Sequence, residues 1–213
     1  MSNKSTRLSL AAMALLFATV MFACGGGTDG DGDGDSGTQQ PPDNGGGIAT
    51  NTVSYDGKTY PLSAGLEEVF RPDDNHANSQ LNVTNGEFYS VQVPITGNLS
   101  LIWRARNASI WFYADVYSPG TGQLQGGTFS YVPRGTDEDD PALAQTFFFK
   151  DGKFAVDLNG DGSVKSDDGE FLTVTGGTIT LEPSGAIYKV DFQFELENGQ
   201  TARGSFTGDF AQV

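Results

Sequence analysis

Alternation of apolar and polar residues with a period of two is the feature that most restricts the fold of this chain. Between residues 188 and 197 every second side chain is hydrophobic, and the intervening positions are polar or charged. Successive side chains of a β-strand point to opposite faces, so this segment predicts a strand with one buried face. Asn198 and Gly199 suit the positive φ angles of a tight turn, and residues 202–210 continue the alternation, which predicts a β-hairpin.

The rest of the chain beyond residue 50 has the same character, without a helical stripe of useful length. Residues 66–70 could form one helical turn. Glycine-containing turn signals at 56–57, 85–86, 151–152, 176–177 and 183–185 separate further short strands. We expect these strands at 53–55, 80–84, 87–93, 98–105, 109–117, 127–132, 145–149, 153–157, 170–175 and 178–182. Many short strands predict an all-β fold, either an antiparallel β-sandwich or a small β-barrel with hairpin connections.

The first 24 residues have the organisation of an export signal. Lys4 and Arg7 precede an uncharged, mostly apolar run over residues 8–23, and Cys24 follows. With Met-Phe-Ala at 21–23 as the lipobox, residues 1–23 resemble a bacterial lipoprotein signal peptide. That resemblance implies lipidation of Cys24 and anchoring in the outer membrane or at the cell surface. The alternative is an ordinary secretory signal cleaved nearby. Cys24 is the only cysteine, so an internal disulfide is excluded.

Residues 24–51 are rich in Gly, Asp, Thr, Gln and Pro and predict a flexible acidic tether, and 52–213 suit a single β domain. The whole chain has a formal charge of −15. Loss of Lys4 and Arg7 with the signal leaves 10 basic and 27 acidic residues, a net charge of −17. Such a surface repels nucleic acid and attracts divalent cations.

Residues 157–168, DLNGDGSVKSDD, place oxygen-bearing side chains at the intervals that a calcium ion requires. Counting from Asp157, the proposed ligands are Asp157 at position 1, Asn159 at 3, Asp161 at 5, Ser163 at 7 and Asp168 at 12. Gly162 at position 6 permits the sharp turn, and Val164 at 8 provides an apolar anchor. The segment resembles the calcium loops of EF-hands, and is closest to the dockerin version, which also ends in Asp.

A strand rather than a helix is expected after this loop, because Gly169 interrupts the chain and residues 170–175 favour β structure. We therefore expect the loop to cap a β-hairpin. The alternative is an acidic turn that binds no ion. Over most of the mature chain, the order of signal, acidic tether, YDGKTYPLS and paired strands ending in GSFTGDF resembles envelope lipoproteins of Bacteroidetes and related bacteria. The resemblance implies no established activity.

Aromatic residues provide a second functional indication. On the strand 109–117, Trp111, Tyr113 and Tyr117 would share a face with Asp115. If exposed, this face would be an aromatic platform of the kind on which sugar rings stack, and these three residues would bind a ligand. The alternative, which we favour, is that the strand is buried on both faces. Trp103 has the same two alternatives.

Catalytic signatures are sparse. The single histidine, His76, lies in the polar segment RPDDNHANSQ and is expected to be a polar loop residue, without a nucleophile motif nearby. Carboxylates available for glycoside hydrolysis are Glu67, Glu68, Glu87 and Glu170. Two function classes follow: a lipid-anchored, calcium-binding β-module that binds a glycan or protein, and a secreted carboxylate-dependent hydrolase. The first is favoured.

Overall fold

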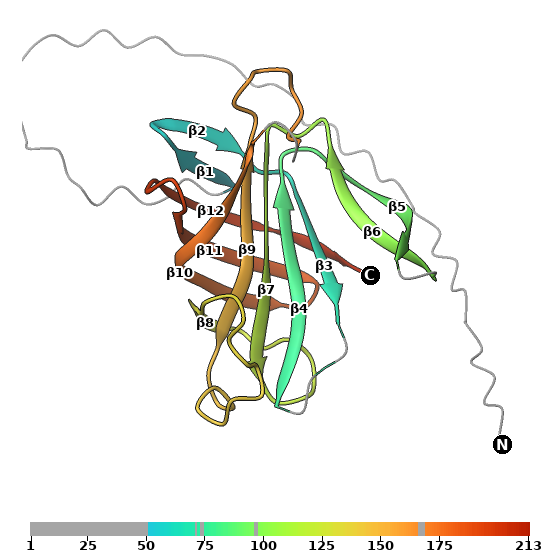
Figure 1. Ribbon diagram of the computed structural model, residues 1–213, viewed down its shortest axis with the longest axis vertical. Helices are drawn as coiled ribbons and strands as arrows, with labels where there is room; N and C mark the ends of the chain where they lie inside the picture. The colour runs from blue at the N-terminus through green and yellow to red at the C-terminus, as the bar shows by residue number, and fades with distance from the viewer. Residues whose placement is uncertain (1–50, 71, 73–74, 96–97, 166–168) are drawn as a thin grey trace, which may run out of the picture. The chain divides into compact units, whose positions relative to one another are not determined.

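A computed structural model describes residues 51–70, 72, 75–95, 98–165 and 169–213. The signal segment, the tether up to residue 50, including Cys24, and Asp168 lie outside the described residues. Within Gly45–Val213, one compact unit, the described residues form strands joined by turns and loops (Figure 1). These strands are β1 (Thr52–Tyr55), β2 (Lys58–Pro61), β3 (Ala64–Val69), β4 (His76–Thr84), β5 (Glu87–Ile95), β6 (Asn98–Arg106), β7 (Ile110–Pro119), β8 (Gly127–Tyr131), β9 (Phe148–Val156), β10 (Phe171–Ser184), β11 (Ile187–Leu196) and β12 (Thr201–Gln212).

The main sheet closes on itself. Its strand order is β11-β10-β8-β9-β7-β4-β3-β12-β1-β2, and β11 also pairs with β12 while β10 also pairs with β9. Seven strands therefore form a ring: β12, β11, β10, β9, β7, β4 and β3. Strand β8 lies between parts of β10 and β9, and the β1–β2 hairpin lies beside β12. The all-β prediction is confirmed. Most pairings are antiparallel, but β3–β12 and β8–β9 are parallel, which hairpin signals do not predict.

The interior of the ring contains the hydrophobic face that the alternation predicts. Phe192 and Phe194 on β11 pack on Phe112 of β7, with ring centroids 4.3 and 5.3 Å apart. Phe210 on β12 lies against Gly65 of β3, where a Cβ atom would approach the Phe210 ring to 2.8 Å. Close packing of aromatic rings around glycine positions thus fills the centre of the ring. The inward residues of β11 are all buried, and they are Tyr188, Val190, Phe192, Phe194 and Leu196.

Three local predictions are wrong. Residues 66–70 do not form a helical turn, since most of them belong to β3. The turn signals at 151–152 and 176–177 do not end strands, because β9 and β10 each run through them. In β10 the register against β11 shifts between Val174 and Gly176, and Gly177 has φ +115°. A glycine at positive φ serves a β-bulge as well as a turn, so the local signal does not distinguish the two.

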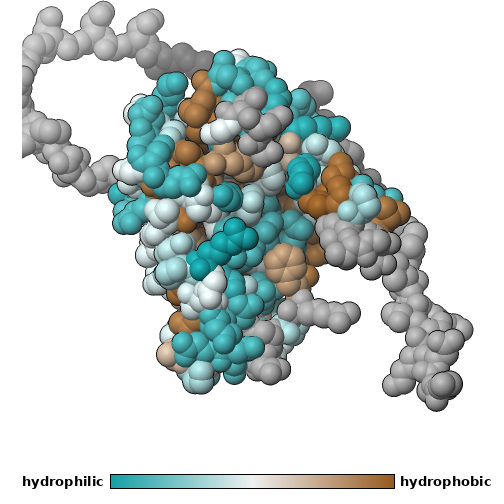
Figure 2. All heavy atoms as spheres, in the orientation of Figure 1, coloured by the Kyte–Doolittle hydropathy of each residue, from teal (hydrophilic) through white to brown (hydrophobic). Residues whose placement is uncertain are grey.

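The β5–β6 hairpin forms a separate two-stranded sheet beside the ring (Figure 1). Leu99 and Leu101 on β6 are 70% and 55% exposed, and hydrophobic side chains gather over this hairpin in Figure 2. The hairpin also covers part of the outer face of the ring, where Trp111, Ala108, Ala155 and Val164 form a second buried cluster.

Candidate functional site

The 157–168 loop joins β9 to β10, and these strands pair antiparallel from Phe171 opposite Ala155. The loop therefore caps a β-hairpin, as predicted. Two of its residues are hydrogen-bonded to the turn before β7: the Asp157 N–H donates to the Ser109 carbonyl at 3.0 Å, and the Val164 N–H donates to the Ala108 carbonyl at 2.9 Å. Val164 is buried in the outer cluster, which is the role expected of position 8.

Side-chain oxygens at alternate positions organise the loop. The two carboxylate oxygens of Asp157 accept hydrogen bonds from the N–H groups of Gly160 and Gly162, at 2.7 and 2.8 Å. Asn159 Oδ1 accepts from the Asp161 N–H at 2.8 Å, and Asp161 Oδ1 accepts from the Ser163 N–H at 3.0 Å. Gly162 has φ +83°, which confirms its predicted role in the turn. The loop backbone thus curls around these oxygens.

The proposed metal ligands are only partly described. Asp157, Asn159, Asp161 and Ser163 lie together in the loop, whereas Asp168 is outside the described residues. Within the described part of the chain, no group of three or more His, Cys, Asp or Glu side chains is placed to hold a metal ion. The described donors are two carboxylates, one amide and one hydroxyl, all of which are oxygen ligands of the kind that calcium takes.

Glu170 directly follows Gly169 at the end of the loop, and the ligand spacing of residues 157–168 does not assign it to this site. Its side chain is 0% exposed, and Oε1 accepts the Leu158 N–H at 3.1 Å while Oε2 accepts the Lys165 N–H at 2.8 Å. A buried charge held by backbone donors fixes both arms of the loop. In the sequence, the indication of this role is an acidic residue directly after Gly169, where the chain enters β10.

Lys165 pairs with the Asp161 carboxylate inside the loop. This hydrogen bond, with that from the Ser163 N–H, lowers the pKa of Asp161 from its ordinary value. The ammonium group thus balances one of the charges that the loop gathers.

A groove of about 890 Å³ lies between the β5–β6 hairpin and the outer face of the ring, and we refer to it as the hairpin groove. Ser163, Val164 and Lys165 of the loop form part of its lining. The aromatic residues that line it are Phe70, Tyr89, Trp103, Trp111, Tyr113 and Phe171. The candidate calcium loop and an aromatic cavity therefore share a wall.

The three aromatic residues proposed as ligand-binding have different positions. Trp111 lines the hairpin groove but is only 6% exposed, and its Nε1–H donates to Asn82 Oδ1 at 3.3 Å. Tyr113 lines the same groove and is half-buried. Tyr117 is 3% exposed, stacks on Phe148 at 4.5 Å and does not line the groove. Trp111 and Tyr117 are thus buried, whereas Tyr113 and Trp103 each keep part of their surface accessible.

A polar network crosses the outer face beneath the groove. Asn82 Nδ2 donates to Glu68 Oε1 at 3.3 Å, and Gln80 Nε2 donates to Asp115 Oδ1 at 2.8 Å. Burial raises the pKa of Glu68, and burial raises the pKa of Asp115 from 3.8 to about 6. Glu68 lines the hairpin groove, and Asp115 does not.

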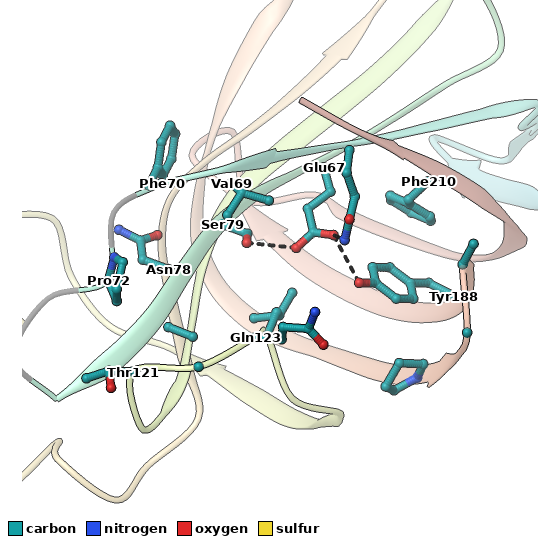
Figure 3. Close-up of a pocket in the computed structure, with 17 residues that line it drawn as sticks. Glu67, Val69, Phe70, Pro72, Asn78, Ser79, Thr121, Gln123, Tyr188 and Phe210 are labelled. Carbon is teal, nitrogen blue, oxygen red and sulfur yellow. Dashed lines mark hydrogen bonds between the residues drawn. The ribbon is translucent and has the colours of Figure 1, made fainter. Parts of the chain in front are cut away.

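A second cavity, of about 810 Å³, lies at one end of the ring (Figure 3). Glu67 projects from β3 into its lining, yet is only 2% exposed. Its carboxylate accepts hydrogen bonds from Ser79 Oγ at 2.8 Å, Tyr188 OH at 3.0 Å and Gln212 Nε2 at 2.8 Å. These donors come from β4, β11 and β12, so Glu67 ties together strands on both sides of the ring closure.

The acids considered for glycoside hydrolysis are dispersed. Glu67 is inside the ring, Glu68 is on its outer face, Glu87 pairs with Arg106 at 3.0 Å, and Glu170 supports the loop. His76 is not the polar loop residue predicted, because it is buried in β4 against Phe148 and its Nε2 donates to the Leu143 carbonyl at 2.9 Å.

No protein-family model, curated protein or solved structure matches this chain. The class that the described residues define is an all-β protein with a closed main sheet and an acidic loop capping a hairpin.

Proposed function

We propose that this protein is a lipid-anchored, calcium-binding β-module of the bacterial cell envelope that binds a glycan or protein partner through the hairpin groove. The observation that carries the proposal is that Ser163 and Lys165 belong to the candidate calcium loop and also line the aromatic hairpin groove. Cavities lined by aromatic side chains with a few polar groups are the usual form of ligand sites.

Calcium binding is supported by the donor chemistry and by the backbone. Asp157, Asn159, Asp161 and Ser163 supply oxygens from a loop whose turns are already formed. Extracellular calcium modules bind with dissociation constants of about 10⁻⁴ to 10⁻³ M. At roughly 1 mM calcium, mass action then adds about 0.4 to 1.4 kcal/mol of stability. For a domain of this size, the melting temperature rises by about 1 to 6 °C.

The test is calcium titration of chelator-treated protein, followed by calorimetry and thermal melting. Asp157→Ala is expected to abolish both the binding heat and the melting shift. Asp209→Ala removes an exposed carboxylate from β12, far along the chain from the loop, and is the matched control that should keep both. A flat titration of the unmodified protein would show that the loop is an acidic turn only.

Lipid anchoring rests on the abrupt change of composition at Cys24. Among the described residues, no helix has the length and hydrophobicity needed to cross a membrane. Cys24→Ser should move the protein from the detergent phase to the aqueous phase and abolish labelling with radioactive fatty acid. Unchanged partitioning, together with absence of label in the unmodified protein, would reject the anchor.

Ligand binding is assigned to the accessible aromatic residues of the groove. Trp103 and Tyr113 are half-buried, so their truncation should weaken binding with little change in stability. Trp111 is the buried floor, and Trp111→Ala should instead cost roughly 3 to 5 kcal/mol of stability. A glycan-array screen followed by titration of Trp103→Ala and Tyr113→Ala separates these outcomes. Full retention of affinity in both variants would place the ligand elsewhere.

The hydrolase alternative needs two carboxylates that flank one substrate. In the described part of the chain, Glu68 is the one carboxylate that lines the hairpin groove, and Glu67 is the one that lines the end cavity. This distribution favours a binding module. If the protein releases reducing ends from a glycan, and Glu68→Gln abolishes that release, the hydrolase is favoured over the binding module.

A further inference from the structure

The hairpin groove differs in charge from the rest of this acidic chain. Its lining includes four basic residues, Arg104, Arg106, Lys153 and Lys165, and Glu68 as the one acid among the described lining residues. The chain as a whole has 12 basic and 27 acidic residues. Basic side chains are therefore concentrated at the aromatic cavity.

Two of these basic groups have no carboxylate partner within the part of the chain that the structure describes. Arg106 pairs with Glu87 and Lys165 with Asp161. By contrast, Arg104 donates to the carbonyl of Trp103 at 3.1 Å, and Lys153 Nζ donates to Thr173 Oγ1 at 2.7 Å. Among the described residues, neither forms an ion pair within 4.0 Å. Both retain N–H donors for an anionic ligand.

We infer that the ligand of the hairpin groove is an acidic glycan, an oligosaccharide carrying carboxylate or sulfate groups. This inference rests on the proposed function and names its ligand class. The Arg104 guanidinium and the Lys153 ammonium bind the anionic groups, which both side chains recognise strongly. Trp103 and Tyr113 offer partly accessible ring faces to the sugar rings.

The remaining polar groups select a glycan rather than a nucleic acid. Glu68 and Gln80 line the groove and can accept hydrogen bonds from sugar hydroxyls. A phosphodiester backbone has no hydroxyl donor for these acceptors. The overall charge of the chain also opposes long polyanions, so a short oligosaccharide fits the site better than a polynucleotide.

The test is calorimetric titration of the full mature chain with an oligogalacturonate, a neutral oligosaccharide of equal length and a single-stranded oligonucleotide, at low and high salt. The acidic oligosaccharide should bind most tightly, and its affinity should fall as salt rises. The double variant Arg104→Gln, Lys153→Gln should lose at least about tenfold in affinity, because two charge-assisted hydrogen bonds are removed. Its melting temperature should stay within 2 °C or so of the unmodified protein, since Arg104 is exposed and Lys153 is only half-buried, and Gln can still donate a hydrogen bond at either position.

The matched control is Lys58→Gln, Arg203→Gln. These two exposed cations also lack an ion pair among the described residues, and neither lines the groove. The control changes net charge equally and should keep affinity. Equal loss in both double variants would overturn the inference, because net charge alone would explain it.

The other outcomes separate the two proposals. If the neutral oligosaccharide binds as tightly as the acidic one, and binding depends on Trp103 and Tyr113, the proposed function stands and the inference of an acidic ligand is overturned. Absence of binding to every oligosaccharide overturns the inference and also the glycan form of the proposed function, which leaves a protein partner for the groove. Preferred binding of the oligonucleotide rejects the glycan class altogether.

Discussion

At the scale of single residues, two buried carboxylates, those of Glu67 and Glu170, are stabilised by hydrogen-bond donors rather than by opposite charges. Glu67 accepts three side-chain hydrogen bonds inside the ring, and Glu170 accepts backbone hydrogen bonds under the loop. Burial and the Glu67 charge raise the pKa of Tyr188 to about 12, so its hydroxyl remains a donor at neutral pH. Removing such a carboxylate leaves donors without partners, which costs more than the bond itself contributes.

Glu170→Gln tests this view for the loop. The amide keeps the shape but replaces one acceptor oxygen with a donor, so a backbone N–H loses its partner. We expect a loss of about 1.5 to 3 kcal/mol in the free energy of unfolding, measured by urea titration. Glu182→Gln, which removes only an exposed pair with Lys189, is the control and should change stability by about 0.5 kcal/mol or less. Equal effects in the two variants would contradict the role of Glu170.

Asp115→Asn tests the raised pKa of Asp115. Because its pKa is about 6 when folded and 3.8 as its ordinary value, the folded state binds the proton more tightly. The unmodified protein therefore loses stability as pH rises from about 4 to about 6, and the penalty persists at pH 7. Asn does not titrate, and its carbonyl can still accept the Gln80 hydrogen bond. The stability of the variant relative to the unmodified protein should increase by up to roughly 3 kcal/mol between pH 4 and pH 7. Urea titrations across that range measure the difference, and a pH-independent difference would refute the argument.

At the scale of elements, glycine allows one long strand to serve two neighbours. β10 pairs with β9 through residues 171–173 and with β8 through residues 178–181, and the bulge at Gly176 and Gly177 separates these parts. A Cβ atom at Gly177 would lie 1.9 Å from the Gln193 carbonyl oxygen. The bulge therefore requires glycine for space as well as for its positive φ.

Gly177→Ala should destabilise the protein by about 2 kcal/mol or more, because both strain and a backbone clash oppose the side chain. The measurement is the midpoint of urea unfolding. Gly122→Ala is the matched control, since nothing lies within 4 Å of its added Cβ atom. Its midpoint should stay close to that of the unmodified protein. A tolerated alanine at 177 would mean that the bulge is adaptable.

At the scale of the main sheet, closure depends on the last strand. Phe210 to Gln212 pair parallel with Gly65 to Glu67, and this short ladder completes the ring. Phe210 is 4% exposed and packs against Phe206 and Tyr188, with centroids 5.6 and 5.2 Å apart. Phe210 thus ties this part of β12 to the core.

Phe210→Ala should cost roughly 3 to 5 kcal/mol, which is a large part of the stability of an ordinary domain. Unfolding monitored by aromatic circular dichroism measures the loss. Ile187→Ala, at a position 47% exposed, is the control and should cost less than about 1 kcal/mol. Similar values for the two variants would show that the closure is not stabilised through Phe210.

The sequence by itself determined the fold class, the buried face of the last hairpin and the turn conformation of the 157–168 loop. Each depends on neighbours in sequence: alternation decides which side chains share a face, and the spacing of Asp157, Asn159 and Asp161 decides which oxygens meet the loop backbone. Binding of calcium by that loop stays a prediction.

Only the tertiary structure decided the parallel closure of β12 on β3, the bulge in β10, the role of Glu170 and the hairpin groove. The ladder joins residues such as Phe210 and Gly65, whose pairing depends on chain closure over the whole domain rather than on a local pattern. A Gly176-Gly177 pair is compatible with a turn and with a β-bulge, and pairing with the neighbouring strands decides that a bulge forms. Arg104 and Lys153 lie 49 residues apart in the sequence, and they line one groove because β6 is folded over the outer face of the ring.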